Sequence, residues 1–332
     1  MAIVLGIEST AHTFGVGVVK DGKILSNAKD TYTTEKGGII PVEAARHHRE
    51  KGKEIYEKSL NDAGINESEI DAIAFSEGPG LAPCLMEGLK FTKEIALRLK
   101  KPVVPVNHCI AHLEVGKITG SKDPVMLYVS GANTQVIAYA SGKYRVFGET
   151  LDIGVGNFID NFARFLGIGF PGGPAMQKLA ENGKKYIELP YSVKGMDIAL
   201  SGILTNLKQK IESRNYSHED LCFSMQETVF AMLVEVAERA LAYTGKRELL
   251  LAGGVACNSR LKEMAEKMCG ERLKKTEFFV PENSLLTDNG AMIAYTGEIL
   301  FKSGIKVSHK DADKLDVKPR QRTDDVEVSW RR

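Results

Sequence analysis

The residues with the clearest potential for chemistry are two histidines four positions apart, His108 and His112. A helix advances about 100° per residue, so positions i and i+4 lie on one face, one above the other. Two imidazoles placed in this way can share one divalent ion. The alternative is a pair of ordinary helix histidines. We favour the metal site because the pair directly follows an apolar run, residues 102–106, that predicts a buried strand.

Composition sets limits on the class of protein. The chain has 332 residues, enough for two domains or lobes, with 43% hydrophobic and 26% charged residues. No apolar run reaches the ~18 residues of a membrane span, and residues 1–6 lack the features of a signal peptide. The cysteines are five, scattered and without a C-x-x-C pair, which favours a reducing compartment over a cysteine zinc site. We therefore expect a cytoplasmic protein without a membrane partner.

Two parts of the chain follow the same order of strands and turns. Residues 3–8, 14–19 and 23–32 predict three strands, and residues 125–130, 135–140 and 144–148 predict three more. We interpret this as a weak internal repeat and predict two related lobes that face each other. Further strands are predicted at 70–75, 102–106 and 249–252, and helices at 41–60, 83–100, 158–166, 218–244 and 291–300. Residues 184–205 are expected to be irregular, and residues 314–332 to be a solvated terminus.

Other residues were weighed as sites and given a structural interpretation. The adjacent His47 and His48 point about 100° apart on a helix, so we expect a hydrogen-bonded or solvated pair. The glycine-rich turn at residues 77–80 is a usual anion site at a helix start, but equally a common way to turn a corner.

Several enzyme classes lack their motif in this chain. There is no Gly-Lys-Ser/Thr of a P-loop and no G-x-S-x-G nucleophile elbow. The zinc-protease pattern H-E-x-x-H needs a glutamate directly after the first histidine, and Cys109 stands there. A metalloprotease would need its base from elsewhere, such as Glu114 or Glu77. We rank that function below a non-proteolytic metal site.

Ordered motifs along nearly the whole chain resemble one family. They lie at residues 6–13, 76–81, 106–112, 127–131, 148–157, 170–174, 253–256 and 288–292. The chain resembles the catalytic subunit of the archaeal and eukaryotic KEOPS complex, a relative of the bacterial TsaD proteins. The resemblance implies an α/β, actin-like ATPase (ASKHA) fold, with two lobes of mixed sheet and flanking helices around a nucleotide and metal cleft. We place the lobes at residues 1–120 and 121–332.

The resemblance also implies an activity. The family transfers the threonylcarbamoyl group from threonylcarbamoyl-AMP to N6 of the adenosine 3′ of the anticodon, in tRNAs that read codons beginning with A. Its archaeal members work with a small kinase/ATPase subunit and two small accessory subunits. A non-catalytic nucleotide-binding scaffold in the same complex is the alternative, because Ala132 and Gln177 depart from the family pattern of Gly and Glu.

Site residues follow from the family motifs. His108, His112 and Asp288 match its metal ligands, with Tyr128 beside them, and the ion is iron or zinc. ATP or threonylcarbamoyl-AMP would occupy the nucleotide site. The residues assigned to it are Tyr128, Val129, Ser130, Gly131 and Ala132 around the phosphates, with Asn133 adjacent, and Asp160, Gly173, Gln177 and Asn258 around the nucleoside.

Charge bears on the tRNA partner. The net charge is +1, so no general basic field attracts nucleic acid. The densest cations near a terminus are Lys318, Arg320, Arg322, Arg331 and Arg332. We therefore predict that productive tRNA binding needs partner subunits.

Overall fold

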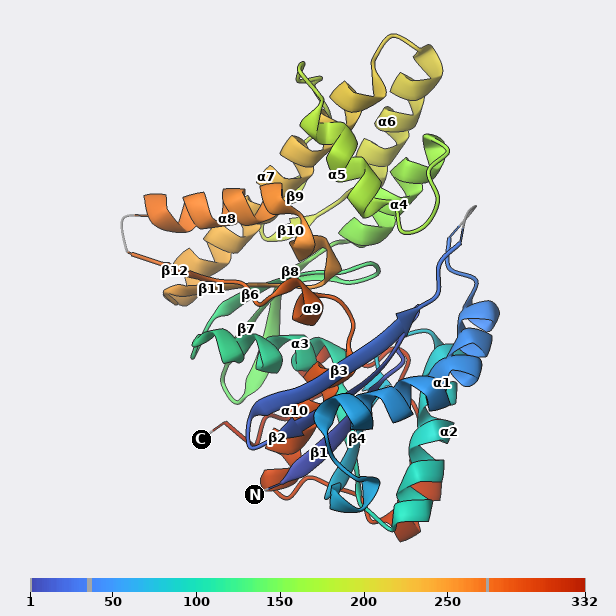
Figure 1. Ribbon diagram of the computed structural model, residues 1–332. Coiled ribbons are helices and arrows are strands. Elements are labelled where there is room, and N and C mark those ends of the chain that lie inside the picture. The colour runs from blue at the N-terminus through green and yellow to red at the C-terminus, as the bar shows by residue number, and fades with distance from the viewer. Residues whose placement is uncertain (1, 35–37, 273–274, 332) are drawn as a thin grey trace.

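The computed structural model describes residues 2–34, 38–272 and 275–331. Two five-stranded sheets organise the chain, and we call each sheet with its helices a lobe (Figure 1). The first sheet has the order β3-β2-β1-β4-β5 and the second β12-β11-β6-β7-β8. The first contains β1 (Ile3–Glu8), β2 (Thr13–Lys20), β3 (Lys23–Thr31), β4 (Ala72–Gly78) and β5 (Val103–Asn107), and the second β6 (Val125–Val129), β7 (Thr134–Ala140), β8 (Lys143–Glu149), β11 (Glu248–Ala252) and β12 (Glu277–Phe279).

The two sheets share one topology. In each, an antiparallel three-stranded meander is extended by two parallel strands: β1 pairs with β4 and β4 with β5, as β6 pairs with β11 and β11 with β12. The internal repeat that we predicted from strand and turn order is thereby confirmed. Both faces of each sheet are covered, so β1 and β6 are buried along their whole length.

Helices cover the outer faces of both lobes. In the first lobe α1 (Pro41–Ala63) and α2 (Ala82–Leu99) pack on the face formed by Leu5, Phe14 and Val16. In the second lobe the outer face of β6 and β7 packs against a helical layer. That layer contains α4 (Val155–Phe165), α5 (Gly173–Glu181), α6 (Ser201–Ser213), α7 (His218–Thr244) and α8 (Ser259–Glu271), with the short hairpin β9 (Val193–Lys194) and β10 (Asp197–Ile198).

One short helix, α3 (His108–Gly116), lies between the two sheets (Figure 1). Its Ala111 and Val115 pack on the inner face of the first sheet, and Cys109, Ile110 and Leu113 pack on the inner face of the second. All nine of its residues are buried. A helix with apolar contacts all round is held rigidly, which suits a helix that carries both candidate metal histidines.

The last long helix, α10 (Gly290–Lys302), packs on the first sheet although it follows the strands of the second. Glycines allow the approach: a Cβ on Gly6 would lie 2.1 Å from Ala294 N, and one on Gly17 would lie 2.3 Å from Ala291 N. Our division at residue 120 placed this helix in the second lobe. The order of the chain does not predict its place, because α10 packs closely on the glycines of β1 and β2 in the first sheet.

Two other expectations are wrong. Residues 184–205 are not irregular throughout, since α6 begins at Ser201. The terminus is not merely solvated: residues 317–331, which we call the C-terminal tail, run across both lobes. Lys318 N donates to Glu77 O in the first lobe, and Thr323 Oγ1 donates to Gln135 Oε1 in the second. Its Val328 is buried against the inner face of the second sheet.

Candidate functional site

Two histidines and an aspartate meet where α3 faces the start of α10. The ligand atoms of His108, His112 and Asp288 all lie within 4.8 Å of one another. Asp288 Oδ1 is 3.4 Å from His108 Nε2 and 3.5 Å from His112 Nε2. The side chains of both histidines are at most 6% exposed and that of Asp288 is 15% exposed. Three convergent donors of this type form a 2-His-1-carboxylate set that leaves positions open on a metal ion.

The chain segments around each ligand hold it in place. β5 ends at Asn107, whose Oδ1 accepts from Ile110 N at 3.1 Å and so caps α3 one residue before His108. Asn289 Oδ1 accepts from Met292 N at 2.9 Å and caps α10, one residue after Asp288. His108 and Asp288 therefore lie at two helix N-termini, each fixed by a buried asparagine, and His112 lies one turn further along α3.

Glu8, at the end of β1, orients His108. Its Oε2 accepts from His108 Nδ1 at 3.0 Å, and its Oε1 accepts from Thr10 N at 2.7 Å and Thr10 Oγ1 at 2.5 Å. When the ring is neutral, as metal binding requires, the bond at Nδ1 selects the tautomer whose Nε2 is free toward Asp288. Burial alone would lower the pKa of His108, but Glu8 and Asp288 outweigh it and raise that pKa well above its ordinary value.

The same charges act on the other two ligands. Burial alone would raise the pKa of Asp288, but the neighbouring His108 and His112 hold it well below its ordinary value. The pKa of His112 is lowered by burial and by the charge of His108, so its imidazole favours the neutral form that binds a metal.

Unpartnered polar atoms provide the test of whether a metal fits. Among the described residues, neither ring nitrogen of His112 nor the Tyr128 hydroxyl has a hydrogen-bond partner, although all are buried. The Tyr128 ring lies 5.1 Å from the His112 ring, centroid to centroid. Buried polar groups without partners are costly, and a divalent ion held by His108, His112 and Asp288 would give His112 Nε2 a partner. The residues present therefore fit a metal ion.

The loop between β6 and β7, residues 130–133, presents free backbone amides next to this cluster. Ser130 N and Oγ both donate to Asn133 O, at 2.9 Å each, which closes the loop. Across the described chain, the N–H groups of Gly131 and Ala132 receive no protein acceptor. Asn133 Nδ2 lies 4.0 Å from Cys109 Sγ, so the loop contacts the residue that directly follows His108 in α3.

The first turn of α4 is already occupied by this loop. Gly156 N donates to Ser130 O at 3.0 Å, Asn157 N to Gly131 O at 2.9 Å, and Val155 N to Thr134 Oγ1 at 2.9 Å. Tyr128 and Val129 lie inside β6, paired with β7. The amides that remain for a phosphate are thus those of Gly131 and Ala132, a narrower set than the five residues we predicted. Ala132 is exposed and has no left-handed φ, so its methyl is accommodated without backbone strain.

The candidates for the nucleoside gather where α4, α5 and α8 converge. Asp160 Oδ1 accepts from Gly172 N at 2.8 Å, and burial raises the pKa of Asp160. Gln177 Nε2 donates to Ser259 Oγ at 3.0 Å, next to Asn258. A Cβ on Gly173 would meet no atom within 4 Å, so open space lies above the start of α5.

Asn258 has a structural role in this arrangement. Its Oδ1 accepts from Arg260 N at 2.9 Å and caps α8, while its Nδ2 donates to Gln226 Oε1 at 2.9 Å. Its side chain is already used by the protein, so any contact with a nucleoside would come from its surroundings.

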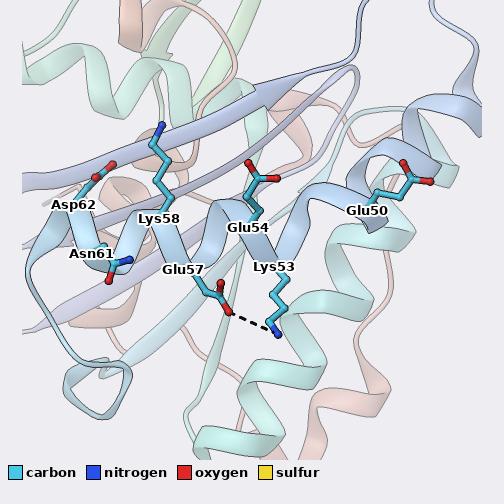
Figure 2. Close-up of a pocket in the computed structure, with 7 residues that line it drawn as sticks. All are labelled: Glu50, Lys53, Glu54, Glu57, Lys58, Asn61 and Asp62. Carbon is cyan, nitrogen blue, oxygen red and sulfur yellow. Dashed lines mark ion pairs between the residues drawn. The ribbon is translucent and has the colours of Figure 1, made fainter.

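A charged hollow lies on the outer face of α1, away from these residues. Figure 2 shows its seven exposed side chains, all from this one helix, with Lys53 Nζ 3.8 Å from Glu57 Oε1. Pairs four residues apart on an exposed helix are ordinary solvated contacts. We assign this face to solvent.

Comparison with known proteins identifies the family. A family model described as tRNA N6-adenosine threonylcarbamoyltransferase matches residues 23–295. The chain is 56% identical over 328 residues to the tRNA N6-adenosine threonylcarbamoyltransferase of Thermococcus sibiricus, covering 99% of this chain and 100% of that relative. The chain belongs to the tRNA N6-adenosine threonylcarbamoyltransferase family. The chain is thus a member of a family of transferases, as the motifs predicted.

Other relatives of this threonylcarbamoyltransferase family are longer. A probable bifunctional tRNA threonylcarbamoyladenosine biosynthesis protein of Methanosarcina mazei is 52% identical over 331 residues, which cover 98% of this chain and 59% of that relative.

Solved structures show the fold alone. HypF of T. kodakarensis covers 92% of this chain and 48% of its own, at 15% identity and a TM-score of 0.65. The dehydratase component A of Acidaminococcus fermentans covers 94% and 100%, at 13% identity and 0.57. The predicted two-lobed actin-like ATPase fold is confirmed.

Sequence reasoning missed three residues of this candidate site. Glu8 and Thr10 lay in a recognised motif but received no role. Their signal was a carboxylate at the end of an otherwise apolar strand, residues 3–8. Lys29, which reaches the Asp288 turn, gave no sequence signal because it is one of several polar residues in the strand Lys23–Thr31.

In the part of the chain that the structure describes, no helix is long and apolar enough to cross a membrane.

Proposed function

We propose that this chain transfers the threonylcarbamoyl group from threonylcarbamoyl-AMP to N6 of the adenosine 3′ of the anticodon, in tRNAs that read codons beginning with A. The observation that carries the proposal is the adjacency of the His108–His112–Asp288 cluster and the Ser130–Asn133 loop. They are joined through the Tyr128 and His112 rings and through Asn133 and Cys109. This adjacency would let one ligand place its phosphate at the loop and its acyl carbonyl toward the cluster.

The protein groups divide the work of binding the donor. The free N–H groups of Gly131 and Ala132 donate to phosphoryl oxygens. The second oxygen of Asp160 accepts from ribose hydroxyls, because its Oδ1 is taken by Gly172 N. His108, His112 and Asp288 hold a divalent ion, iron or zinc, which when bound supplies Lewis-acid stabilisation of charge on the acyl carbonyl.

The transfer needs no nucleophilic side chain from this chain. The adenosine N6 attacks the carbamoyl carbon, the bond from that carbon to the AMP oxygen breaks, and N6 loses one proton. Glu8 keeps the imidazole of His108 in one orientation throughout.

The protease alternative loses both of its candidate bases. Glu114 accepts from Lys117 Nζ, Trp330 Nε1 and the Tyr144 hydroxyl. Glu77 is paired with Lys318 Nζ at 3.0 Å and accepts from Gln321 Nε2 at 3.1 Å. Each carboxylate is thus engaged by the C-terminal tail rather than free to activate water.

The state of the tail also supports partner-dependent tRNA binding. Lys318 pairs with Glu77, Arg322 with Glu149 and Asp324, and Arg331 with Asp123 while stacking on the Tyr139 ring. Arg332 lies outside the described residues. Among the described cations of the tail, Arg320 is the one with no carboxylate of the described residues within ion-pair distance. We propose that the small kinase/ATPase and two accessory subunits of a KEOPS complex supply the remaining phosphate contacts.

Nucleoside mass spectrometry tests the function. Unmodified tRNA is incubated with the chain, its partners, threonine, bicarbonate and ATP, and the digest is analysed for threonylcarbamoyladenosine. Modification is expected with the wild type and not with His108→Ala. A His108→Ala protein that modifies tRNA at the wild-type rate contradicts the metal-assisted mechanism, and a wild-type reaction without product contradicts the transferase.

A further inference from the structure

The side chain of Lys29 crosses from the edge strand β3 of the first sheet to the turn that carries Asp288. Its ammonium lies 2.5 Å from Thr287 Oγ1, 3.3 Å from Asp288 O and 3.5 Å from Ser284 O. All three acceptors belong to one short segment, residues 284–288. Among the described residues, no carboxylate lies within ion-pair distance of this ammonium. A partly buried lysine whose ammonium donates to three neutral oxygens, and not to a carboxylate, is in a position to fix the segment that supplies those oxygens.

The Asp288 turn is thereby held from two sides. From within, Asn289 Nδ2 donates to Thr287 O at 2.7 Å and to Leu285 O at 3.3 Å. From the first sheet, Lys29 binds the side chain of Thr287 and the carbonyl of Asp288. The carboxylate of Asp288 must stay near two histidines that belong to a different helix, α3. A residue that fixes the backbone of Asp288 relative to the first sheet also fixes this ligand relative to α3, which packs on the same sheet.

We infer that Lys29 is a positioning residue for the carboxylate of Asp288, acting through Thr287 and the Asp288 carbonyl. It does not touch the reacting atoms. Replacing Lys29 changes none of the three proposed metal-binding residues. It does allow the turn between α9 (Asn283–Leu286) and α10, which carries Asp288, to move. The inference rests on the metal site proposed above and identifies what keeps that site assembled.

Zinc affinity of the full-length metal-free protein, measured by competition with a chromophoric chelator, tests the inference without any activity assay. Changing a residue that hydrogen-bonds to a metal ligand typically costs about 10–100-fold in metal affinity, so Lys29→Met is expected to weaken Zn²⁺ binding about tenfold. Lys29→Arg keeps a cation and donors and is expected to restore most of the affinity. Lys23→Met, an exposed lysine on the same strand, is the matched control and is expected to bind as the wild type does.

A double-mutant cycle guards against a merely structural effect. Thr287→Val removes the closest acceptor of Lys29 without touching the lysine. If the two residues act as one unit, the double variant Lys29→Met/Thr287→Val loses little more zinc affinity than Lys29→Met alone. Thermal unfolding of each metal-free variant verifies that it is folded, and Thr287→Val alone carries the test if Lys29→Met does not fold.

The outcomes separate this inference from the metal site itself. Wild-type zinc affinity in folded Lys29→Met, together with loss in His108→Ala, overturns the role of Lys29 and leaves the metal site standing. Equal losses in Lys29→Met and Lys23→Met also overturn it, because they would reflect general charge. A wild-type protein that binds no zinc or Fe²⁺ overturns the proposed site and this inference together.

Discussion

The loops after β1 and β6 occupy equivalent places in two sheets of identical topology, yet they are built differently. In the first lobe, the amides of Ser9 and Thr10 are taken by the side chains of Ser76 and Glu8. In the second lobe, the loop closes through Ser130 and Asn133 and leaves its central amides free. One sheet plan thus serves two tasks: next to the first loop Glu8 orients the candidate metal ligand His108, and the second loop presents backbone donors.

The anchors of the two loops also differ in their response to pH. His48 Nε2 donates to Ala11 O at 3.0 Å, and His48 Nδ1 lies 3.4 Å from His47 Nδ1, so the predicted hydrogen-bonded histidine pair is confirmed. The second loop is held by hydroxyl and backbone groups that do not titrate near neutral pH. Acid therefore acts on the first loop and spares the second.

The largest expected effect concerns the glycine contacts of the first lobe. Gly17→Val forces side-chain atoms into the backbone of α10, where even a Cβ would lie 2.3 Å from Ala291 N. Overpacking of this kind is expected to cost about 3 kcal/mol or more of unfolding free energy. Gly202→Ala in α6 of the second lobe meets no atom within 4 Å and is the control. Urea unfolding of both variants makes the measurement, and equal stabilities would contradict the close α10 contact.

Acid is expected to weaken the first loop through His48, which is 1% exposed. Burial, with the charge of His47 adding to it, lowers the pKa of His48 from 6.5 to about 4. A lowered histidine pKa means that the fold prefers the neutral ring. Its stabilisation is complete above about pH 6.5 and is lost as pH falls toward 4, by up to about 3 kcal/mol at roughly 1.4 kcal/mol per pKa unit.

The control for this pH effect is His48→Gln, which keeps a donor for Ala11 O but does not titrate. Its unfolding free energy should fall less steeply than that of the wild type between pH 6.5 and pH 4. Parallel slopes would show that His48 does not carry the acid sensitivity.

A smaller effect is expected where the C-terminal tail joins the lobes. Trp330 Nε1 donates to Glu114 Oε1 at 2.9 Å, on the same helix as the metal histidines. Trp330→Phe keeps most of the ring contact but removes this donor to a buried carboxylate, at a cost of about 1.5 kcal/mol. Ser329→Ala changes an exposed neighbour and serves as the control. Thermal unfolding of the two variants compares them, and a Trp330→Phe protein as stable as Ser329→Ala would refute the anchoring role.

The smallest effect is expected at Ala132 in the second loop. Its methyl is exposed and meets no strain, so Ala132→Gly should leave ADP affinity unchanged or slightly tighter. Gly156→Ala is the contrasting variant, because its Cβ would lie 2.6 Å from Gly131 Cα and displace the loop. Displacement costing about 1.4 kcal/mol would weaken ADP about tenfold. Calorimetric titration distinguishes them, and markedly weaker binding in Ala132→Gly would contradict the phosphate role of the loop.

Local sequence patterns were sufficient to predict the strands of both sheets and the helical face that carries the two histidines. Alternation and turn residues gave both meanders, and the spacing of His108 and His112 gave one face of α3. The start of α6 was missed although Leu200, Ile203, Leu204 and Leu207 have helical spacing, because Pro190 and Gly195 in the preceding segment suggested a loop. Sequence spacing alone also could not place Asp288 beside α3, and the family resemblance supplied that residue.

Long-range packing explains the remaining errors. Nothing in the composition of α10 indicates that it covers the first sheet, since the signal lies in Gly6 and Gly17, far away in sequence. The tail has no hydrophobic period, and its attachment depends on single contacts such as Thr323 with Gln135. Contacts of this kind become visible only when both partners are placed in three dimensions.

The packing of α10 on the first sheet sets an order of events during synthesis. The last strand of that sheet ends at Asn107, whereas the helix that covers its inner face begins at Gly290. A ribosome adding 5–20 residues per second takes roughly 10 to 40 s to make the intervening chain. Throughout that interval the nascent first sheet lacks the helix that covers Val4 and Ala74. The residues made first are therefore closed by residues made almost last, and a chaperone that shields exposed strands has its longest opportunity on this face.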